Sequence, residues 1–216
     1  MAAVRLRTPL SEADVRALRA GDEVLLSGSV HTGRDRFHKA VFESGECPVD
    51  LAGGALFHCG PVVVPDAAAP GGWRVVAAGP TTSCREEPYM AAIVERHGLR
   101  AIVGKGGMGE ATRGACRRCG CVYLQAVGGA AALLARCVKR VAAVHFLDEF
   151  GATEACWSLD VEDLPLLVGM DASGRSLYAE VEAASRQALE TIFAGKHSSL
   201  VTRHSSLDGR GRRPST

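Results

Sequence analysis

The sequence predicts an α/β protein, because short runs of β-branched and apolar residues alternate along the chain with segments of helical apolar spacing. Glycines mark the junctions, and four glycine-rich turns lie where a predicted strand passes into a predicted helix. The 216 residues are enough for one large domain or two small ones. In such folds ligands usually bind where strands end and helices begin, so these turns are the places to look for a site.

The predicted helices are marked by capping residues and by apolar residues on one face. Ser11, with Asp14 three residues later, forms a variant of the capping box and starts a short helix that stops at Gly21. Gly45 and Gly98 are predicted to end two longer helices. The longer helices are predicted over 33–45, about 85–97, about 109–118, 128–138 and 178–194.

The predicted strands are short apolar runs, over 23–30, 54–60, 73–78, 100–104, 121–127, 140–147 and 155–170. Proline and glycine predict a loop over 61–72, and 171–175 reads as a turn. After residue 194 the chain has few apolar residues and four arginines. We therefore expect one folded domain over 1–194 and a disordered tail over 195–216.

Composition excludes some classes of protein. The formal net charge of +1 gives no general attraction to nucleic acid or to a membrane surface. No apolar run approaches the roughly 20 residues that span a bilayer, and the first residues lack the apolar segment of a signal peptide. We expect a cytoplasmic protein, in which the eight cysteines are reduced rather than paired as disulfides.

The first two turns carry arginines and hydroxyls. Arg34 follows a glycine at the start of the helix over 33–45, where an exposed arginine with no function is the alternative. In the second turn, Thr81, Thr82 and Ser83 occupy an N-cap region, where unpaired N–H groups favour an anion. Arg85 adds a guanidinium that matches a carboxylate or phosphate. A capped helix with spare hydroxyls is the alternative, since one hydroxyl is enough.

The third turn, over 104–109, matches the dinucleotide pattern G-x-G-x-x-G. Two features argue against a nucleotide: Lys105 stands in the turn, and after Glu110 the next carboxylate is Asp148, too far away for a ribose. The fourth turn, over 127–134, has no charged side chain, and its small residues indicate close packing.

Cys116, Cys119 and Cys121 form a separate cluster. The C-x-x-C spacing is compatible with zinc or an iron–sulfur cluster. No second C-x-x-C or H-x-x-H pair completes such a site, so small buried residues are the alternative that we favour, with no metal bound by this chain.

Taken together, the motifs resemble those of the β subunit, or C-terminal domain, of the iron–sulfur hydro-lyases, the class I fumarate hydratases and L(+)-tartrate dehydratases. The resemblance covers residues from about 4 to about 180, with the motifs in the family's order. They are SGSVHTGRDRFHK, PVDLAGGALFHCGP, AAGPTTSCR, IVGKGGM, VYLQAVGGAAALLA and WSLDVEDLPLLVGMDASGRSLY.

The resemblance implies a three-layer β/β/α swivelling domain rather than a doubly wound Rossmann sheet. It implies a partner α subunit that holds a [4Fe–4S] cluster with three cysteines, in a hetero-oligomer with a dimeric core. The free iron of that cluster would bind the carboxylate and hydroxyl of the substrate as a Lewis acid. The implied reaction is the reversible loss of water from a C4 hydroxy-dicarboxylate, either malate or tartrate.

Site residues follow from the same resemblance. Arg34, Arg85 and Lys105 match the family's substrate-binding cations, and Thr81 matches its proton-transferring threonine, with Thr82 beside it as a further substrate-binding residue. The chain departs from the family at Cys84 and at Glu86, and Glu86 adds negative charge beside an anion site.

Two other functions remain open at this point. A non-catalytic or regulatory homologue of the same fold is one, although a scaffold has no need of these cations and hydroxyls at three turns. A nucleotide-binding α/β protein is the other. The sequence leaves the choice between malate and tartrate open, because much of the pocket would lie on the partner chain.

Overall fold

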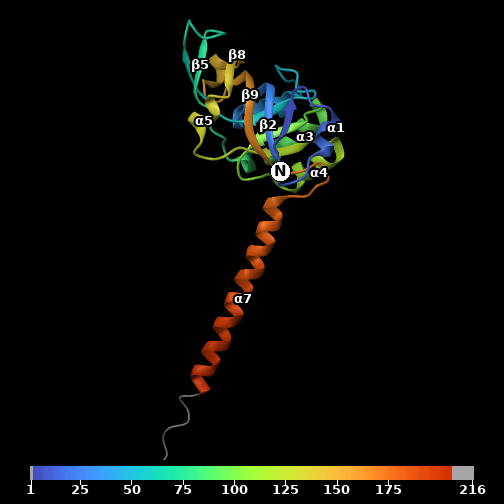
Figure 1. The fold of residues 1–216 in the computed structure, drawn as a ribbon, viewed down its shortest axis with the longest axis vertical. Coiled ribbons are helices and arrows are strands. Elements are labelled where there is room, and N and C mark those ends of the chain that lie inside the picture. Colours follow the sequence, from blue (N-terminus) through green and yellow to red (C-terminus); the bar gives the residue numbers. More distant parts are fainter. Residues whose placement is uncertain (1, 206–216) are drawn as a thin grey trace, which may run out of the picture. The chain divides into compact units, whose positions relative to one another are not determined.

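The computed structural model describes residues 2–205, with side chains as far as residue 193. Contacts divide the chain into two units, Met1–Leu177 and Tyr178–Thr216. The first unit is a mixed α/β structure in which strands and helices alternate (Figure 1), as the sequence predicts.

A seven-stranded sheet in the order β1-β2-β3-β6-β7-β9-β8 forms the frame of the first unit. Its strands are β1 (Val4–Arg7), β2 (Glu23–Gly33), β3 (Ala55–His58), β6 (Ala101–Gly104), β7 (Val122–Gln125), β8 (Val138–His145) and β9 (Cys156–Met170). Neighbours from β1 to β7 run parallel, whereas β9 is antiparallel to β2, β7 and β8. Because β9 pairs with both β2 and β7, the strands β2, β3, β6, β7 and β9 close into a ring.

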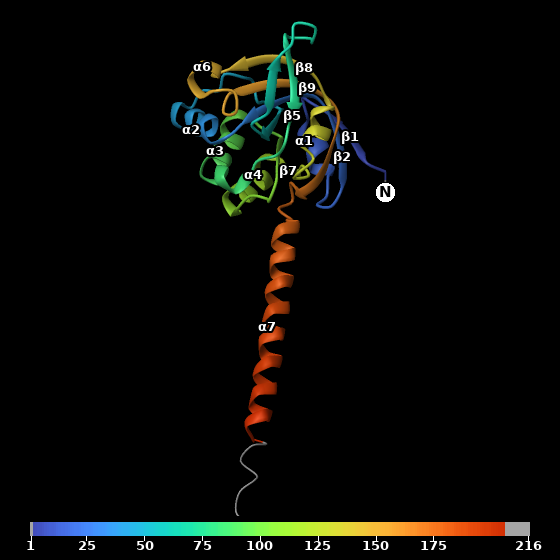
Figure 2. The same ribbon diagram turned by 90° about the vertical axis from the view of Figure 1, so that its left-hand side faces the viewer.

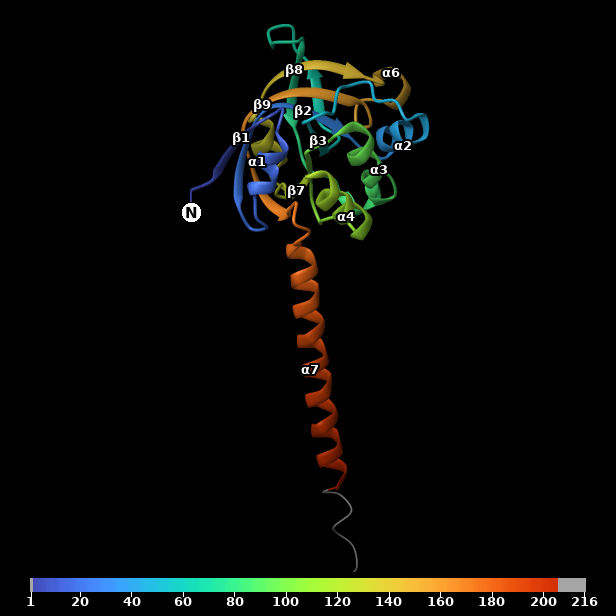
Figure 3. The ribbon, with the colours of Figure 1, turned by 90° about the vertical axis from the view of Figure 1, so that its right-hand side faces the viewer.

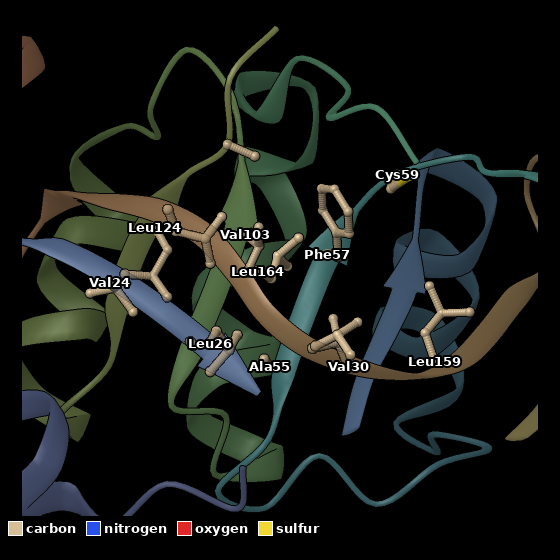
Figure 4. Packing of buried hydrophobic residues seen from close by; sticks show 14 of the residues in the cluster. Val24, Leu26, Val30, Ala55, Phe57, Cys59, Val103, Leu124, Leu159 and Leu164 are labelled. Carbon is tan, nitrogen blue, oxygen red and sulfur yellow. The ribbon is translucent and has the colours of Figure 1, made fainter. Parts of the chain in front are cut away.

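The inside of this ring is apolar. Figure 4 shows the side chains that meet there from β2, β3, β6, β7 and β9, among them Leu26, Phe57, Val103, Leu124 and Leu164. Successive residues of a strand point to opposite faces. The alternate residues Leu56, Ile102 and Tyr123 are also fully buried, so these strands are covered on both faces. This explains why their sequences are short apolar runs without polar alternation.

Helices cover the outer face of the parallel strands. Helices α2 (Asp35–Ser44), α3 (Glu87–His97) and α4 (Glu110–Cys119) pack against one another and lie on one side of the unit in Figures 2 and 3. Gly45 and Gly98 end α2 and α3 with φ of 74° and 64°, as predicted. The remaining helices of this unit are α1 (Glu12–Ala17), α5 (Ala131–Ala135), α6 (Leu147–Phe150) and the 3-10 helix η1 (Ser83–Glu86).

The capping box at α1 is confirmed. The Ser11 hydroxyl accepts a hydrogen bond from the Asp14 N–H at 3.1 Å, and the Asp14 carboxylate accepts one from the Ser11 N–H at 2.8 Å. Two backbone N–H donors at the helix start are therefore satisfied locally.

One sequence-based assignment is wrong, and another gives a helix that is too long. The region 61–72, predicted as a loop, contains β4 (Val62–Pro65), which pairs antiparallel with β5 (Trp73–Ala77), so only the segment between them is a turn. Proline is tolerated here because Pro65 is the last residue of its strand. The helix predicted over 128–138 is short, since Gly129 has a φ of 84° before α5 and β8 begins at Val138.

In the second unit, α7 (Leu177–Ser205) continues past residue 194, where the sequence predicted its end. Val181, Leu189, Ile192 and Phe193 are exposed on it. The rest of the predicted disordered tail, 206–216, lies outside the described residues, so the domain boundary at 194 stays a prediction. Among the helices that the structure describes, none combines the length and apolar character needed to cross a membrane.

Candidate functional site

Three of the four predicted turns meet at one edge of the sheet. Because β2, β3 and β6 are parallel, their carboxyl ends lie at the same edge. The second turn contacts both of the others: Arg85 pairs with Asp35 of the first turn, and the Ser83 N–H donates to the Lys105 carbonyl of the third turn at 3.0 Å. The Thr81 N–H also donates to the carbonyl of His58, at the end of β3, at 2.7 Å. The fold thus brings Arg34, Thr81 and Lys105 together from three separate parts of the sequence.

Arg34 is held at the start of α2 beside a carboxylate from the segment before β9. Its Nε lies 3.4 Å from Glu154 Oε1, and its side chain is 24% exposed. The other oxygen of Glu154 accepts a hydrogen bond from the Arg36 N–H at 3.0 Å, so this carboxylate also satisfies the start of α2. Gly60 makes room for the arginine, because a Cβ there would stand 2.8 Å from Arg34 Cδ.

Arg85 forms an ion pair with Asp35, the first residue of α2. The Arg85 side chain is 52% exposed, so the pair contributes little to stability, about 0–1 kcal/mol. A guanidinium has several N–H donors, and one carboxylate does not use them all. Arg85 is therefore oriented by Asp35 and keeps donors for a second anion.

Lys105 has no ion pair with any residue that the structure describes. Its side chain passes the fourth turn, where a Cβ on Gly128 would be 3.6 Å from Lys105 Cδ. The fourth turn also packs closely, as predicted: the Ala78 N–H donates to the Ala131 carbonyl at 2.9 Å, and a Cβ on Gly79 would lie 3.0 Å from that of Ala131.

The three hydroxyls of the second turn differ in their use. The Ser83 hydroxyl is buried and bonds the Tyr123 hydroxyl at 2.9 Å, so it is structural. Thr82 is the N-cap of η1 but makes no side-chain cap bond. The Thr81 hydroxyl likewise has no hydrogen bond to a described residue. The alternative of a helix capped by one of these hydroxyls is therefore not supported, and among the described residues the two threonine hydroxyls have no partner that would keep them from a ligand.

Three ionisable side chains lie fully buried among the elements that carry these turns: Glu86 of η1, His38 of α2 and His58 of β3. His38 Nδ1 is 3.4 Å from Glu86 Oε2, and the two imidazole rings meet edge to face with centroids 4.9 Å apart. Burial raises the pKa of the Glu86 carboxyl to about 7, and it lowers the pKa of His38 to about 4. The pair is within ion-pair distance, but a neutral imidazole does not neutralise a carboxylate.

The glycine-rich turn over 104–109 is closed to a nucleotide at the place where a pyrophosphate would bind. Glu87 Oε2 accepts hydrogen bonds from the Gly109 N–H and the Thr112 hydroxyl, both at 2.7 Å, and Oε1 accepts one from the Thr112 N–H at 3.2 Å. The start of α4 is therefore capped by a carboxylate of this chain, which disfavours the nucleotide alternative.

Comparison with known proteins identifies the family. The sequence model described as "Fumarase C-terminus" matches residues 1–181. A protein of Methanocaldococcus jannaschii named as an L(+)-tartrate dehydratase subunit beta is 41% identical over 191 residues, which cover 85% of this chain and 95% of that protein. The chain belongs to the fumarase C-terminus family.

Of two further relatives, one is named as a fumarate hydratase and the other as a tartrate dehydratase subunit. A protein of Geobacillus stearothermophilus named as a class I fumarate hydratase is 46% identical over 195 residues, or 88% of this chain. The match spans only 37% of that longer protein. The L(+)-tartrate dehydratase subunit beta of Escherichia coli K12 is 36% identical over 177 residues, covering 81% of this chain and 86% of that subunit.

The last family motif ends in GMDASGRSLY, and its aspartate, Asp171, has a structural role. Buried Asp171 accepts hydrogen bonds from the N–H groups of Ala20, Ser173 and Arg175 at 2.9–3.1 Å, and from the Ser173 hydroxyl at 2.6 Å. This aspartate therefore ties the turn after β9 to the segment before β2, and all its polar contacts are used by the fold.

The cysteine cluster of this chain does not fit an iron–sulfur cluster. Cys116 and Cys119 are in the last turn of α4, roughly 10 Å and roughly 15 Å along the helix from the end of the Lys105 turn. Burial raises the pKa of the Cys119 thiol and, more strongly, that of Cys121, which disfavours the thiolate that a metal needs. Among the described residues, no three His, Cys, Asp or Glu side chains are grouped so that they could hold a metal.

Sequence reasoning missed the carboxylates that surround the predicted cations. Asp35 lies next to Arg34 in the chain but pairs with Arg85, and Glu154 reaches Arg34 from 120 positions away. Glu87 directly follows Glu86, one of the two positions at which the sequence departs from the family. Nothing in the sequence shows that Glu87 caps α4. Asp35 and Glu87 carried a local signal, each as an acidic residue in the first turn of a helix, but that signal does not reveal their partners.

Proposed function

We propose that this chain is the β subunit of a two-subunit [4Fe–4S] hydro-lyase that reversibly removes water from a C4 hydroxy-dicarboxylate. Membership of the fumarase C-terminus family supports this, as does similarity to two tartrate dehydratase β subunits over most of their length. The observation that carries the proposal is the meeting of Arg34, Arg85, Lys105 and two unused threonine hydroxyls at one edge of the sheet.

In this proposal the cations bind the substrate carboxylates. Arg34 and Arg85 offer planar donor groups already oriented by Glu154 and Asp35, and Lys105 adds a point charge. A charge-assisted contact of this kind contributes about 1.5–3 kcal/mol. Thr82 would be a further contact to the substrate.

Thr81 would move the proton at the carbon next to the leaving hydroxyl. A threonine hydroxyl is a poor base, so this step requires activation by an acidic residue of the partner subunit. The free hydroxyl of Thr81 and its backbone anchor to His58 support the assignment, because they hold the residue in place without using its side chain.

The cluster would be held by the partner α subunit, since the cysteines of this chain are poorly suited to it. The complex would be a cytoplasmic hetero-oligomer with a dimeric core. We also propose that the ring of strands with its outer helices is the three-layer β/β/α swivelling domain of the family. The substrate would be malate or tartrate, with the choice depending on both subunits.

Reconstitution tests the proposal. The purified chain is expected to be colourless and inactive, and mixing with a cluster-loaded α subunit is expected to generate dehydratase activity. In that complex, Lys105→Met and Arg85→Met should each lower kcat/KM by about 10–150-fold on the preferred dicarboxylate. Lys39→Met, the same change at an exposed lysine of α2, is the control.

The outcomes separate the candidate functions. Full kcat/KM in both site variants on every C4 dicarboxylate would refute the anion site. A stable complex without activity on any of them would favour a regulatory homologue. A brown iron–sulfur absorbance in the isolated chain would instead assign ligands to Cys116, Cys119 and Cys121.

A further inference from the structure

Glu86 is the one acidic member of this buried cluster of three side chains, and neither of its oxygens has a hydrogen-bond partner among the residues that the structure describes. The nearest candidate is His38, but its Nδ1–H donates to the Arg34 carbonyl at 2.8 Å, which leaves Nε2 as the bare acceptor. His38 Nε2 and both ring nitrogens of His58 are buried as well, without a hydrogen-bond partner in the described part of the chain. A carboxylate in this setting lacks the contacts that stabilise its charge, so the protonated form is favoured.

The charges around Glu86 come from each element that packs against η1. The charges of Arg85 and Arg34 favour its ionised form, and that of Glu154 opposes it. His38 and His58 stay uncharged, because burial lowers the pKa of His38 to about 4 and that of His58 well below its usual value. The charged and titratable side chains on η1 and on the elements around it are Arg85 of η1, Arg34, Asp35 and His38 of α2, His58 of β3, Lys105 after β6 and Glu154 before β9.

We propose that Glu86 sets the charge of the anion site: protonated, it leaves Arg34 and Arg85 free to attract a dicarboxylate, and ionised, it opposes that dicarboxylate. This inference rests on the proposed function, since it concerns the same anion site. Glu86 is a positioning residue rather than a catalytic one, because it lies beneath the surface and acts through the field at the two arginines.

The sign of the effect follows from burial. Glu86 is neutral at acidic pH and ionises as the pH passes its pKa of about 7, while both histidines stay neutral. Substrate affinity therefore falls across neutral pH. One additional negative charge near a binding site of this kind weakens anion binding by about 3–10-fold.

The test is the pH dependence of KM for a C4 dicarboxylate in the reconstituted complex, between about pH 6 and about pH 8. In the wild-type complex, KM is expected to rise by about 3–10-fold over this range. In Glu86→Gln the rise should disappear and KM should stay near its low-pH value. Glu86→Met, a second uncharged variant, guards against a folding defect in the first, and Glu43→Gln on the exposed face of α2 is the matched control.

A readout without activity accompanies the kinetics. The Glu86 carboxyl carbon of the full chain, assigned by its loss in Glu86→Gln, should titrate near neutral pH in a carbon-13 NMR experiment. An ordinary carboxyl pKa for Glu86 would overturn the inference. So would an active complex in which Glu86→Gln and Glu86→Met both keep the wild-type KM profile, as the Glu43→Gln control should, and that result would leave the proposed function intact. A complex inactive at every pH would overturn the proposed function, and the inference with it.

Discussion

The replacement of Thr81 by alanine distinguishes proton transfer from helix capping. A capping hydroxyl contributes about 1 kcal/mol to stability when it makes its bond. Thr82 makes no cap bond and the Thr81 hydroxyl has no described partner, so neither alanine variant loses a contact of the folded chain. We expect both variants to unfold in urea within about 0.5 kcal/mol of the wild type.

The kinetic effects of the two variants should differ. If Thr81 transfers the proton, Thr81→Ala lowers kcat in the complex by about 100-fold or more with little change in KM, which corresponds to about 2.7 kcal/mol of transition-state stabilisation. Thr82→Ala should mainly raise KM, because its role is binding. Steady-state kinetics and exchange of the substrate C3 proton with deuterated water measure the two effects.

Proton exchange provides the refutation. If Thr81→Ala exchanged the C3 proton at the wild-type rate while Thr82→Ala did not, the roles of the two threonines would have to be reversed. If both variants exchanged it normally, the base would belong to the partner subunit. A loss of more than about 1 kcal/mol of stability in Thr81→Ala would show that its hydroxyl is used by the fold after all.

Three further predictions concern the rest of the site. Glu87→Ala should lower the free energy of unfolding by about 2–3 kcal/mol, because three hydrogen bonds to the start of α4 are lost. A loss of less than about 0.5 kcal/mol in a urea titration would contradict the capping role of Glu87. The folded state holds His38 neutral, with a pKa of about 4 against the usual 6.5, so its contribution is present above about pH 6.5 and is lost as the pH falls towards 4. Over that range the free energy of unfolding of His38→Gln should fall by about 3 kcal/mol less than that of the wild type, and an unchanged pH profile in the variant would refute this. Iodoacetamide at neutral pH should label exposed Cys84 well before buried Cys121, as peptide mass spectrometry would show; equal rates would contradict the burial of Cys121.

Local sequence patterns determined most of the elements and the positions of the turns. The Ser11 capping box and the glycines at 45 and 98 act within a few residues, so their outcome follows from the sequence alone. The same holds for the turns that carry Arg34, Thr81 and Lys105, since each lies between an apolar run and an amphipathic segment. The resemblance to the hydro-lyase family could also be recognised from the sequence alone, because whole motifs occur in the family's order.

Long-range contacts were decided only by the tertiary structure. Strand β4 was hidden among prolines and glycines, and it forms because β5 supplies its hydrogen bonds. Closure of the ring depends on β9 reaching both β2 and β7, which no local pattern encodes.

The charges of the site depend on the same long-range contacts. The sequence places Glu86 beside Arg85, whereas the fold buries Glu86 against His38 of α2 and pairs Arg85 with Asp35. Glu154 reaches Arg34 only because β9 returns to pair with β2. Ion pairing and desolvation depend on distances in space, so the residue types of this site can be read from the sequence but their charge states cannot.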